Sequence, residues 1–333
     1  MNNKVLAILD REEGYAYGLM EFFEERENLP FRLHVFTSQD RFNAFGMKEE
    51  IECLLVSENI YNRCLEEYHI PHIIVLSETG SIVNNTLHHI NKYQSCDGIY
   101  REVLQYYADH SQDATSLVRK STKNLKVIGI YTPIGRCLQT KFSVTLGQLL
   151  SRKAKTLYMN FERYSGLSLV LERDFNSDIS DLMYYFECAK EKLSYRIDSI
   201  VENVGGLDFI PPANIYQNLA GIRGEQWVDL FMEMEKCTEY EYLILDLTDG
   251  VPDLWHILRF CDKVYTISRG DTLAMAKIDQ YEKTIKDTEY SEVLTKTKKC
   301  ALPMFQNLPH KFDELSQSEL ARFIREFILP EMV

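Results

Sequence analysis

The residues best placed to do chemistry lie in one stretch that runs from Val127 to Leu150. It opens with a short β-branched apolar run, breaks at Pro133 and Gly135, and continues with apolar residues at helical spacing. This order predicts a strand, a loop and a helix, which is the frame of a phosphate-binding loop. In such a loop, glycines allow backbone N–H groups to surround phosphates, and a lysine neutralises their charge.

The stretch resembles the deviant Walker A loop, Lys-Gly-Gly-x-Gly-Lys-Thr, of the MinD/ParA ATPases. Gly135 matches the first glycine, and Thr140 matches the residue whose hydroxyl binds Mg²⁺ in that family. Ile134 replaces the lysine that crosses the family's dimer interface, and Gln139 replaces the lysine that holds the β- and γ-phosphates. By this resemblance, the nucleotide-binding residues are Gly135, Arg136, Cys137, Leu138, Gln139, Thr140 and Lys141.

The two missing lysines bear on activity. Without them the loop lacks the charge that stabilises phosphoryl transfer, so we expect a degenerate nucleotide site without efficient ATPase activity. One alternative is an active ATPase in which Lys141 or Arg136 replaces the missing lysine; of the two, Arg136 is better placed, since it lies within the loop. Another is an ordinary strand–helix unit that binds no ligand.

Polar residues that follow later strands extend the resemblance. Asn160 and Glu162 stand where the family carries acids that activate water and hold metal, and Asp246 ends an apolar strand in the Walker B position. An amide does not accept a proton near neutral pH, so Asn160 cannot act as a base. The resemblance implies ATP or ADP as the cofactor, Mg²⁺ held by Thr140 and Asp246, and Pro303 near the adenine. The alternative is that the site binds no cofactor.

The segment from Gly206 to Trp227 resembles the "G-x-D/Y-I-P-P … D-L … W" segment of the TadZ/CpaE branch of the MinD/ParA group. TadZ/CpaE proteins help to localise and assemble the Tad/Flp pilus secretion machinery, often as dimers. The resemblance therefore implies a localisation or scaffold protein, a homodimer, and partners in Tad/Flp pilus assembly. It also implies a cytoplasmic protein, with the cell pole or the membrane periphery as possible positions.

Residues 1–110 alternate short apolar strands with helices, which predicts a parallel sheet covered on both faces. The order resembles a response-regulator receiver domain. Asp10 keeps one member of the receiver's acidic pair, Ser57 replaces the phosphoacceptor aspartate, and Ser77 and Lys92 match the remaining two positions. Without a carboxylate nucleophile no aspartyl phosphate can form, so we expect a pseudo-receiver that serves as an interaction module. An atypical response regulator is the alternative.

The length of 333 residues suggests two domains. We expect the α/β class throughout: a receiver-like (flavodoxin-like) parallel sheet in 1–110, a polar linker over 111–124, and a MinD/ParA-like P-loop NTPase sheet in 125–333. The eight cysteines occur singly, without a C-x-x-C pair, which favours reduced thiols in the cytoplasm.

The chain is acidic, with a net charge of −13, and residues 1–110 hold 18 acidic and 9 basic side chains. An acidic chain without a basic stripe is a poor candidate for binding DNA. Near the C-terminus, residues 316–329 form an amphipathic pattern whose polar face mixes Glu and Arg. We expect this helix to pack on its own domain, with at most a peripheral membrane contact. Its apolar face comprises Leu320, Phe323, Ile324, Phe327 and Ile328.

Overall fold

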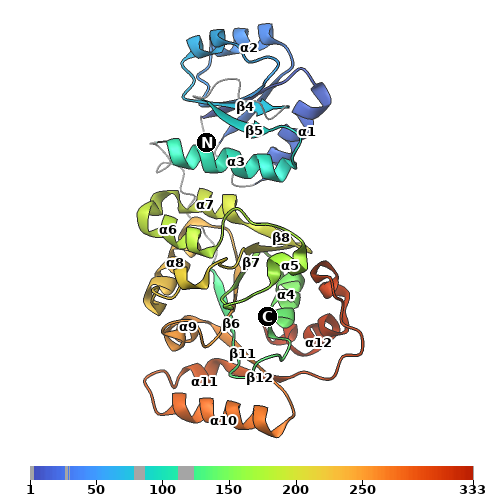
Figure 1. Ribbon diagram of the computed structural model, residues 1–333, viewed down its shortest axis with the longest axis vertical. Helices are drawn as coiled ribbons and strands as arrows, with labels where there is room; N and C mark the ends of the chain where they lie inside the picture. The colour runs from blue at the N-terminus through green and yellow to red at the C-terminus, as the bar shows by residue number, and fades with distance from the viewer. Residues whose placement is uncertain (1–3, 27–28, 30, 79–86, 112–123, 333) are drawn as a thin grey trace. The chain divides into compact units, whose positions relative to one another are not determined.

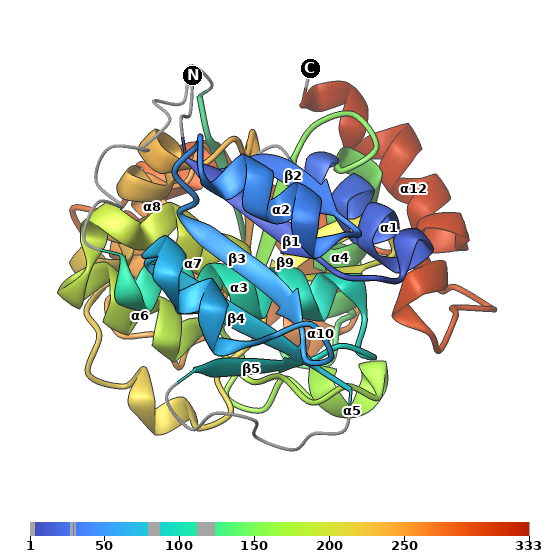
Figure 2. The same ribbon diagram turned by 90° about the horizontal axis from the view of Figure 1, so that it is seen from above.

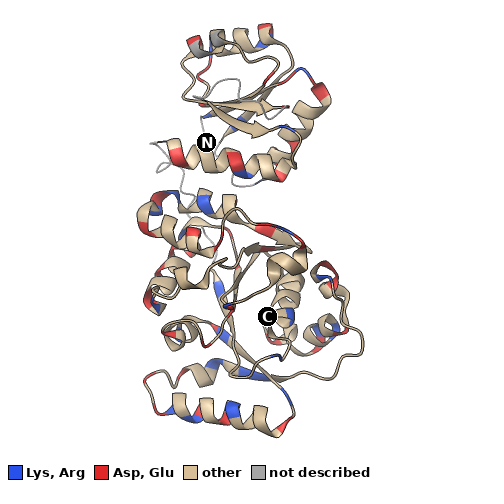
Figure 3. Cartoon of the chain, in the orientation of Figure 1, with Lys and Arg blue, Asp and Glu red and all other residues tan. Residues whose placement is uncertain are grey.

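The computed structural model describes residues 4–26, 29, 31–78, 87–111 and 124–332 (Figure 1). The chain divides into two compact units, Met1–Val118 and Arg119–Val333, here called unit 1 and unit 2 and described separately. Most of the predicted linker lies outside the described residues. Acidic and basic side chains are interspersed along the helices of both units (Figure 3).

Unit 1 alternates strands and helices, as its apolar runs predict. Its strands are β1 (Val5–Leu9), β2 (Arg32–Phe36), β3 (Cys53–Ser57), β4 (His72–Ser77) and β5 (His88–Asn91). Its helices are α1 (Glu13–Glu24), α2 (Gln39–Gly46), the 3₁₀ helix η1 (Arg63–Tyr68) and α3 (Cys96–His110).

The five strands of unit 1 are all parallel and lie in the order β2-β1-β3-β4-β5 (Figure 2). This is the flavodoxin-like order, in which ligands bind beyond the carboxyl ends of the strands. Val5, Ala7 and Leu9 of β1 pack on Phe42 of α2 at one face of the sheet. Successive strand residues point to opposite faces. The apolar residues that alternate with these three therefore point to the opposite face. Both faces of the sheet are apolar, and the strands appear in the sequence as continuous hydrophobic runs.

Unit 2 is larger, and its elements again alternate over most of its length. Its strands are β6 (Lys126–Ile130), β7 (Thr156–Asn160), β8 (Glu202–Val204), β9 (Leu207–Ile210), β10 (Tyr242–Asp246), β11 (Lys263–Ser268) and β12 (Thr297–Ala301). Its α-helices are α4 (Gln139–Leu150), α5 (Leu167–Leu171), α6 (Ile179–Cys188), α7 (Leu193–Ile200), α8 (Gly224–Cys237), α9 (Leu254–Phe260), α10 (Thr272–Lys286), α11 (Val293–Lys296) and α12 (Glu319–Phe327).

The sheet of unit 2 has the order β12-β11-β6-β10-β7-β9-β8, and its pairs are parallel except for the antiparallel pair of β8 and β9. Helices α4 and α12 cover one face, while α8 and α9 cover the other (Figure 1). Trp227 of α8 is buried against Phe161, with ring centroids 4.9 Å apart. These two layers confirm the expected α/β class with parallel sheets.

Side-chain caps fix where several helices begin. Asp178 accepts a hydrogen bond from the Ser180 amide at 2.7 Å and starts α6, as the sequence predicts. Ser318 caps α12 in the same way. The residue that caps α4, Leu138, has a left-handed backbone and supplies no capping side chain. The N-cap residue of α4 therefore provides no acceptor for the N–H groups of the first turn.

The C-terminal helix packs on unit 2. Leu320, Ile324 and Ile328 are buried in a core cluster with residues of α4, and Phe323 is partly buried against it. Phe327 keeps to the expected face, with its ring 5.1 Å from that of Phe323, although it is 55% exposed. Within the described residues, no helix combines the length and apolar character needed to cross a membrane.

Candidate functional site at the carboxyl ends of the parallel strands

Asp246 occupies the carboxyl end of the central strand of unit 2. Strand β10 lies between β6 and β7, and Asp246 is in register with Ile130 on one side and Asn160 on the other. The loop that follows β6 leads directly into α4. This topology therefore brings the phosphate-loop residues and the two polar strand ends to one edge of the sheet.

The Asp246 carboxylate is fully buried and is surrounded by hydrogen-bond donors. Gln139 donates from Nε2 to Oδ1 at 2.6 Å. On the other side, the Tyr158 hydroxyl and the Asn160 amide donate to Oδ2 at 2.9 and 3.1 Å. Thr140 also hydrogen bonds to this carboxylate. All four donors are neutral, so the buried charge is stabilised by hydrogen bonds and not by an ion pair.

A cavity of about 320 Å³ opens beside this network. It is lined by residues 132–141, by Glu162 and by residues 247–249. Within the loop, Arg136 and Leu138 have φ angles of +55° and +67°, a conformation that L residues seldom adopt. Successive backbone turns of this kind can direct N–H groups into one concavity, which is how phosphate-binding loops are built.

The structure brings most of the predicted nucleotide-site residues to this cavity. Its lining includes the whole segment 135–141 and Glu162, whereas Asn160 and Asp246 lie behind it in the hydrogen-bond network. Pro303 does not line the cavity, although the resemblance places it near the adenine. Lys141 turns its ammonium group to the carbonyl of Pro309 at 3.0 Å, so its charge is directed away from Asp246.

Burial raises the pKa of both acids at the site. It raises the pKa of Asp246, although hydrogen bonds from its four donors act in the opposite direction. Burial and the nearby charge of Asp246 raise the pKa of Glu162 to about 7, although a hydrogen bond from Thr140 lowers it. Glu162 therefore titrates near neutral pH, whereas an ordinary surface glutamate titrates well below it.

Two tyrosines belong to the site and were not predicted. Tyr158 donates to Asp246 and accepts from Asn160 at 2.8 Å, and the hydroxyl of Tyr131 donates to Asp249. The signal for Tyr158 was present in the sequence, because residues two apart on a strand point to the same face. Tyr158 stands two residues before Asn160 and so had to face the same side of β7.

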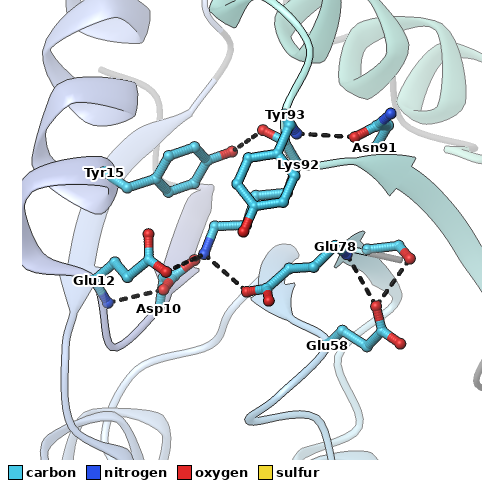
Figure 4. A network of polar contacts seen from close by, with 9 residues as sticks. Asp10, Glu12, Tyr15, Glu58, Glu78, Asn91, Lys92 and Tyr93 are labelled. Atoms are coloured by element: carbon cyan, nitrogen blue, oxygen red, sulfur yellow. Dashed lines mark hydrogen bonds and ion pairs between the residues drawn. The ribbon is translucent and has the colours of Figure 1, made fainter. Parts of the chain in front are cut away.

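A second polar group lies at the carboxyl ends of the strands of unit 1 (Figure 4). The ammonium group of Lys92 is buried and lies 2.8 Å from Asp10, 3.2 Å from Glu78 and 3.4 Å from Glu12. It also sits over the ring of Tyr15, 4.7 Å from the centroid. Asp10 and Lys92, both predicted site residues, thus meet, whereas Glu12 and Glu78 were not predicted.

The other two predicted residues of unit 1 end neighbouring strands. Ser57 is buried at the end of β3, and Ser77 donates its hydroxyl hydrogen to Glu58 at 2.9 Å. The same Glu58 oxygen accepts from the backbone amide of Glu78 at 2.9 Å. Burial alone would lower the pKa of Lys92, but hydrogen bonds and charges from its acidic neighbours raise it above the ordinary lysine value. Lys92 therefore remains charged.

Comparison with protein-family models and with curated proteins gives no match for this chain. Among solved structures, the chain is similar to a ParA family ATPase from Chlorobium tepidum, with 17% identity, a TM-score of 0.46 and coverage of 58% of this chain and 79% of the other.

A putative plasmid partition protein from Borrelia burgdorferi bound to AMPPNP shares 16% identity, with a TM-score of 0.44 and coverage of 62% and 100%. The MinC:MinD cell division protein complex of Aquifex aeolicus shares 18%, with a TM-score of 0.40 and coverage of 52% and 67%. The solved structures similar to part of this chain thus include ATPases of the ParA and MinD type.

Proposed function

We propose that this chain is a localisation and scaffold protein of the TadZ/CpaE kind. Unit 2 would keep a degenerate nucleotide site that binds ATP or ADP weakly and does not hydrolyse ATP efficiently. The observation that carries the proposal is the contact between Gln139 and Asp246. The side chain at the position of the family's phosphate-binding lysine is neutral and is turned onto the acid at the Walker B position.

The geometry offers little to an active ATPase. Lys141 donates to the carbonyl of Pro309, and Arg136 is an exposed residue of the loop. Positioned charge is the main contribution that a protein makes to phosphoryl transfer, and a solvent-exposed arginine supplies it poorly. Asn160 cannot remove a proton from water. Slow turnover, or none, is the expected behaviour.

In the same proposal, unit 1 is a pseudo-receiver that contacts a partner and is not phosphorylated. Ser57 provides a hydroxyl where a phosphoacceptor needs a carboxylate, and Lys92 is already engaged with three acids. A response regulator that works by aspartyl phosphate would therefore have to use a displaced acid. Labelling with acetyl phosphate that depends on Asp10 would favour that rival function.

The proposed partners are a second copy of the chain and proteins of Tad/Flp pilus assembly, in the cytoplasm at the cell pole or membrane periphery. Ile134 is buried, so a dimer could not use this position to reach across an interface as a lysine would. Exposed apolar side chains beyond the strand ends of unit 2 offer contact area instead: Tyr164 and Met304 on loops and Leu169 on α5.

The test is to titrate ATP into the purified full-length protein by calorimetry, to size both states, and to measure phosphate release. Weak binding with a shift from monomer to dimer, and release no faster than background, would support a nucleotide-gated scaffold. Phosphate release well above background that is lost in Arg136→Ala would overturn the proposal in favour of an active ATPase. In cells, a fluorescent fusion should form a focus at the pole.

A further inference from the structure

The residues that the family uses for Mg²⁺ are already occupied by hydrogen bonds in this chain. Both oxygens of Asp246 accept from neutral side chains, and the carboxylate is fully buried behind them. Thr140 lies within hydrogen-bond reach of both Asp246 and Glu162, and its one hydroxyl hydrogen can be donated to only one of them at a time. Mg²⁺ demands a near-ideal octahedron of oxygens at about 2.0 to 2.1 Å, which this arrangement does not present. The residues in place therefore do not fit the cation.

Gln139 is the side chain that closes the site. Its Nε2 atom lies 2.6 Å from Asp246 Oδ1, 2.9 Å from the carbonyl oxygen of Leu247 and 3.3 Å from that of Ile130. Because all three neighbours are acceptors, the amide must present its NH₂ group and not its oxygen. An NH₂ group is not a metal ligand, so a cation could reach Oδ1 only after this amide had left.

The rest of the cavity is suited to an anion that brings no metal. Arg136 carries a positive charge in the loop, and the first turn of α4 has no side-chain cap for its N–H groups. Asp246 lies behind its four donors and does not line the cavity. Two acids line the cavity: Glu162, which shares a hydrogen bond with Thr140 at the wall, and Asp249, which accepts one from the Tyr131 hydroxyl.

We infer that the cavity binds the phosphate chain of a nucleotide without a divalent cation, and that Gln139 is the residue that excludes the cation. The inference rests on the proposed nucleotide site and concerns its specificity. It differs from the Mg²⁺-dependent site that the Walker A resemblance implies. Binding would depend on backbone N–H groups and Arg136, so it would be weak, and Mg²⁺ would weaken it further by complexing the free nucleotide.

The experiment uses the full-length protein and two probes. ATP is titrated by calorimetry in EDTA and in excess Mg²⁺, and Mn²⁺ alone is titrated while its free-ion EPR signal is followed. The wild-type protein should bind ATP less tightly in excess Mg²⁺ than in EDTA, because Mg²⁺ complexes the free nucleotide, and it should bind no Mn²⁺. Gln139→Ala should bind Mn²⁺ and should bind ATP about tenfold more tightly with Mg²⁺ than with EDTA, since a freed carboxylate is a hard oxygen ligand.

Controls separate the arms of the test. Gln280→Ala, an exposed glutamine of α10, should behave as wild type, and Gln139→Ala/Asp246→Asn should lose the gained Mn²⁺ binding. Gln139→Met keeps the side-chain volume and replaces the alanine variant if that variant does not fold. ATP binding to the wild type that requires Mg²⁺, or equal Mn²⁺ binding by wild type and Gln139→Ala, would overturn the inference while leaving the nucleotide site intact. ATP binding by neither protein would overturn both metal-free phosphate binding and the proposed nucleotide site.

Discussion

The carboxyl ends of the two sheets each hold a buried acid, but the two acids are stabilised in different ways. In unit 1, Asp10 is paired with Lys92 at 2.8 Å, and both side chains are almost fully buried. In unit 2, the donors that reach Asp246 among the described residues are all neutral. Unit 1 thus places a lysine against its buried acid, whereas unit 2 places the amide of Gln139 there.

The difference shows two ways to offset the cost of burying a carboxylate. An opposite charge in direct contact keeps an acid ionised, and its removal leaves an uncompensated charge in the interior. Several neutral donors also favour the ionised form, yet burial still raises the pKa of Asp246. The stability of unit 1 should therefore be the more sensitive to loss of one side chain, and the stability of unit 2 should be the more sensitive to pH.

The largest effect should come from Lys92→Met, which removes the cation from the acids of unit 1. We expect a loss of about 3 to 5 kcal/mol in the free energy of unfolding, because Asp10 stays buried without a counter-charge. Urea unfolding followed by far-UV circular dichroism measures it. Both tryptophans, Trp227 and Trp255, belong to unit 2, so the fluorescence transition should not move.

Glu12→Gln is the matched control for that variant. Glu12 also contacts Lys92, at 3.4 Å, but its side chain is 58% exposed. Loss of an exposed ion pair costs about 0 to 1 kcal/mol. If Lys92→Met were no more destabilising than Glu12→Gln, the buried ion pair would not be the main support of this end of unit 1.

A smaller loss in the free energy of unfolding is expected from Gln139→Leu, which removes a neutral hydrogen-bond donor from Asp246 in unit 2. Asp246 Oδ1 and the carbonyl of Leu247 would each lack a donor, and an unsatisfied buried polar group costs about 1 to 3 kcal/mol. The tryptophan fluorescence transition in urea should report the change. Gln280→Leu on exposed α10 should leave it unaltered, and an equal shift in both variants would contradict the prediction.

Gln139→Lys would give unit 2 the kind of ion pair found in unit 1. An ammonium group has three donors for the three acceptors around Gln139, so we expect stabilisation of about 1 kcal/mol at neutral pH. The new charge lowers the pKa of Asp246 in the folded state. The gain over the wild type should therefore be present above the raised folded pKa that Asp246 has in the wild type and be lost as the pH falls through its lower folded pKa in the variant, which unfolding at several pH values would show.

The smallest effect concerns Glu162, whose pKa of about 7 lies above its ordinary value of 4.5. The folded protein holds this proton more tightly than the unfolded chain does. The stabilisation that Glu162 contributes to the folded state therefore falls as the pH rises from 4.5 to about 7, and it stays low above that pH. Glu162→Gln should flatten this part of the stability–pH curve of unit 2, by less than about 1 kcal/mol. An unchanged curve would mean that Glu162 titrates as a surface acid.

Much of the architecture could be predicted because it depends on local patterns. Continuous apolar runs such as Tyr242–Asp246 favour buried parallel strands, and the alternation with helices predicts crossover connections. The Asp178 cap was predicted from residue type alone. The start of α8 at Gly224 could not be placed from the pattern, because helix boundaries depend on caps and on packing that a periodic pattern does not contain.

The sequence by itself determined that acids and amides stand at the ends of parallel strands, because strand length and residue order place them there. Only the tertiary structure decided which groups meet. Gln139 contacts Asp246, which is 107 positions further along the chain. Lys92 follows the edge strand β5 and contacts Asp10, which follows β1, with β3 and β4 between the two strands. Hydrogen bonds and ion pairs of this kind depend on distances of a few tenths of an ångström and on competing partners, which residue types and spacing do not specify.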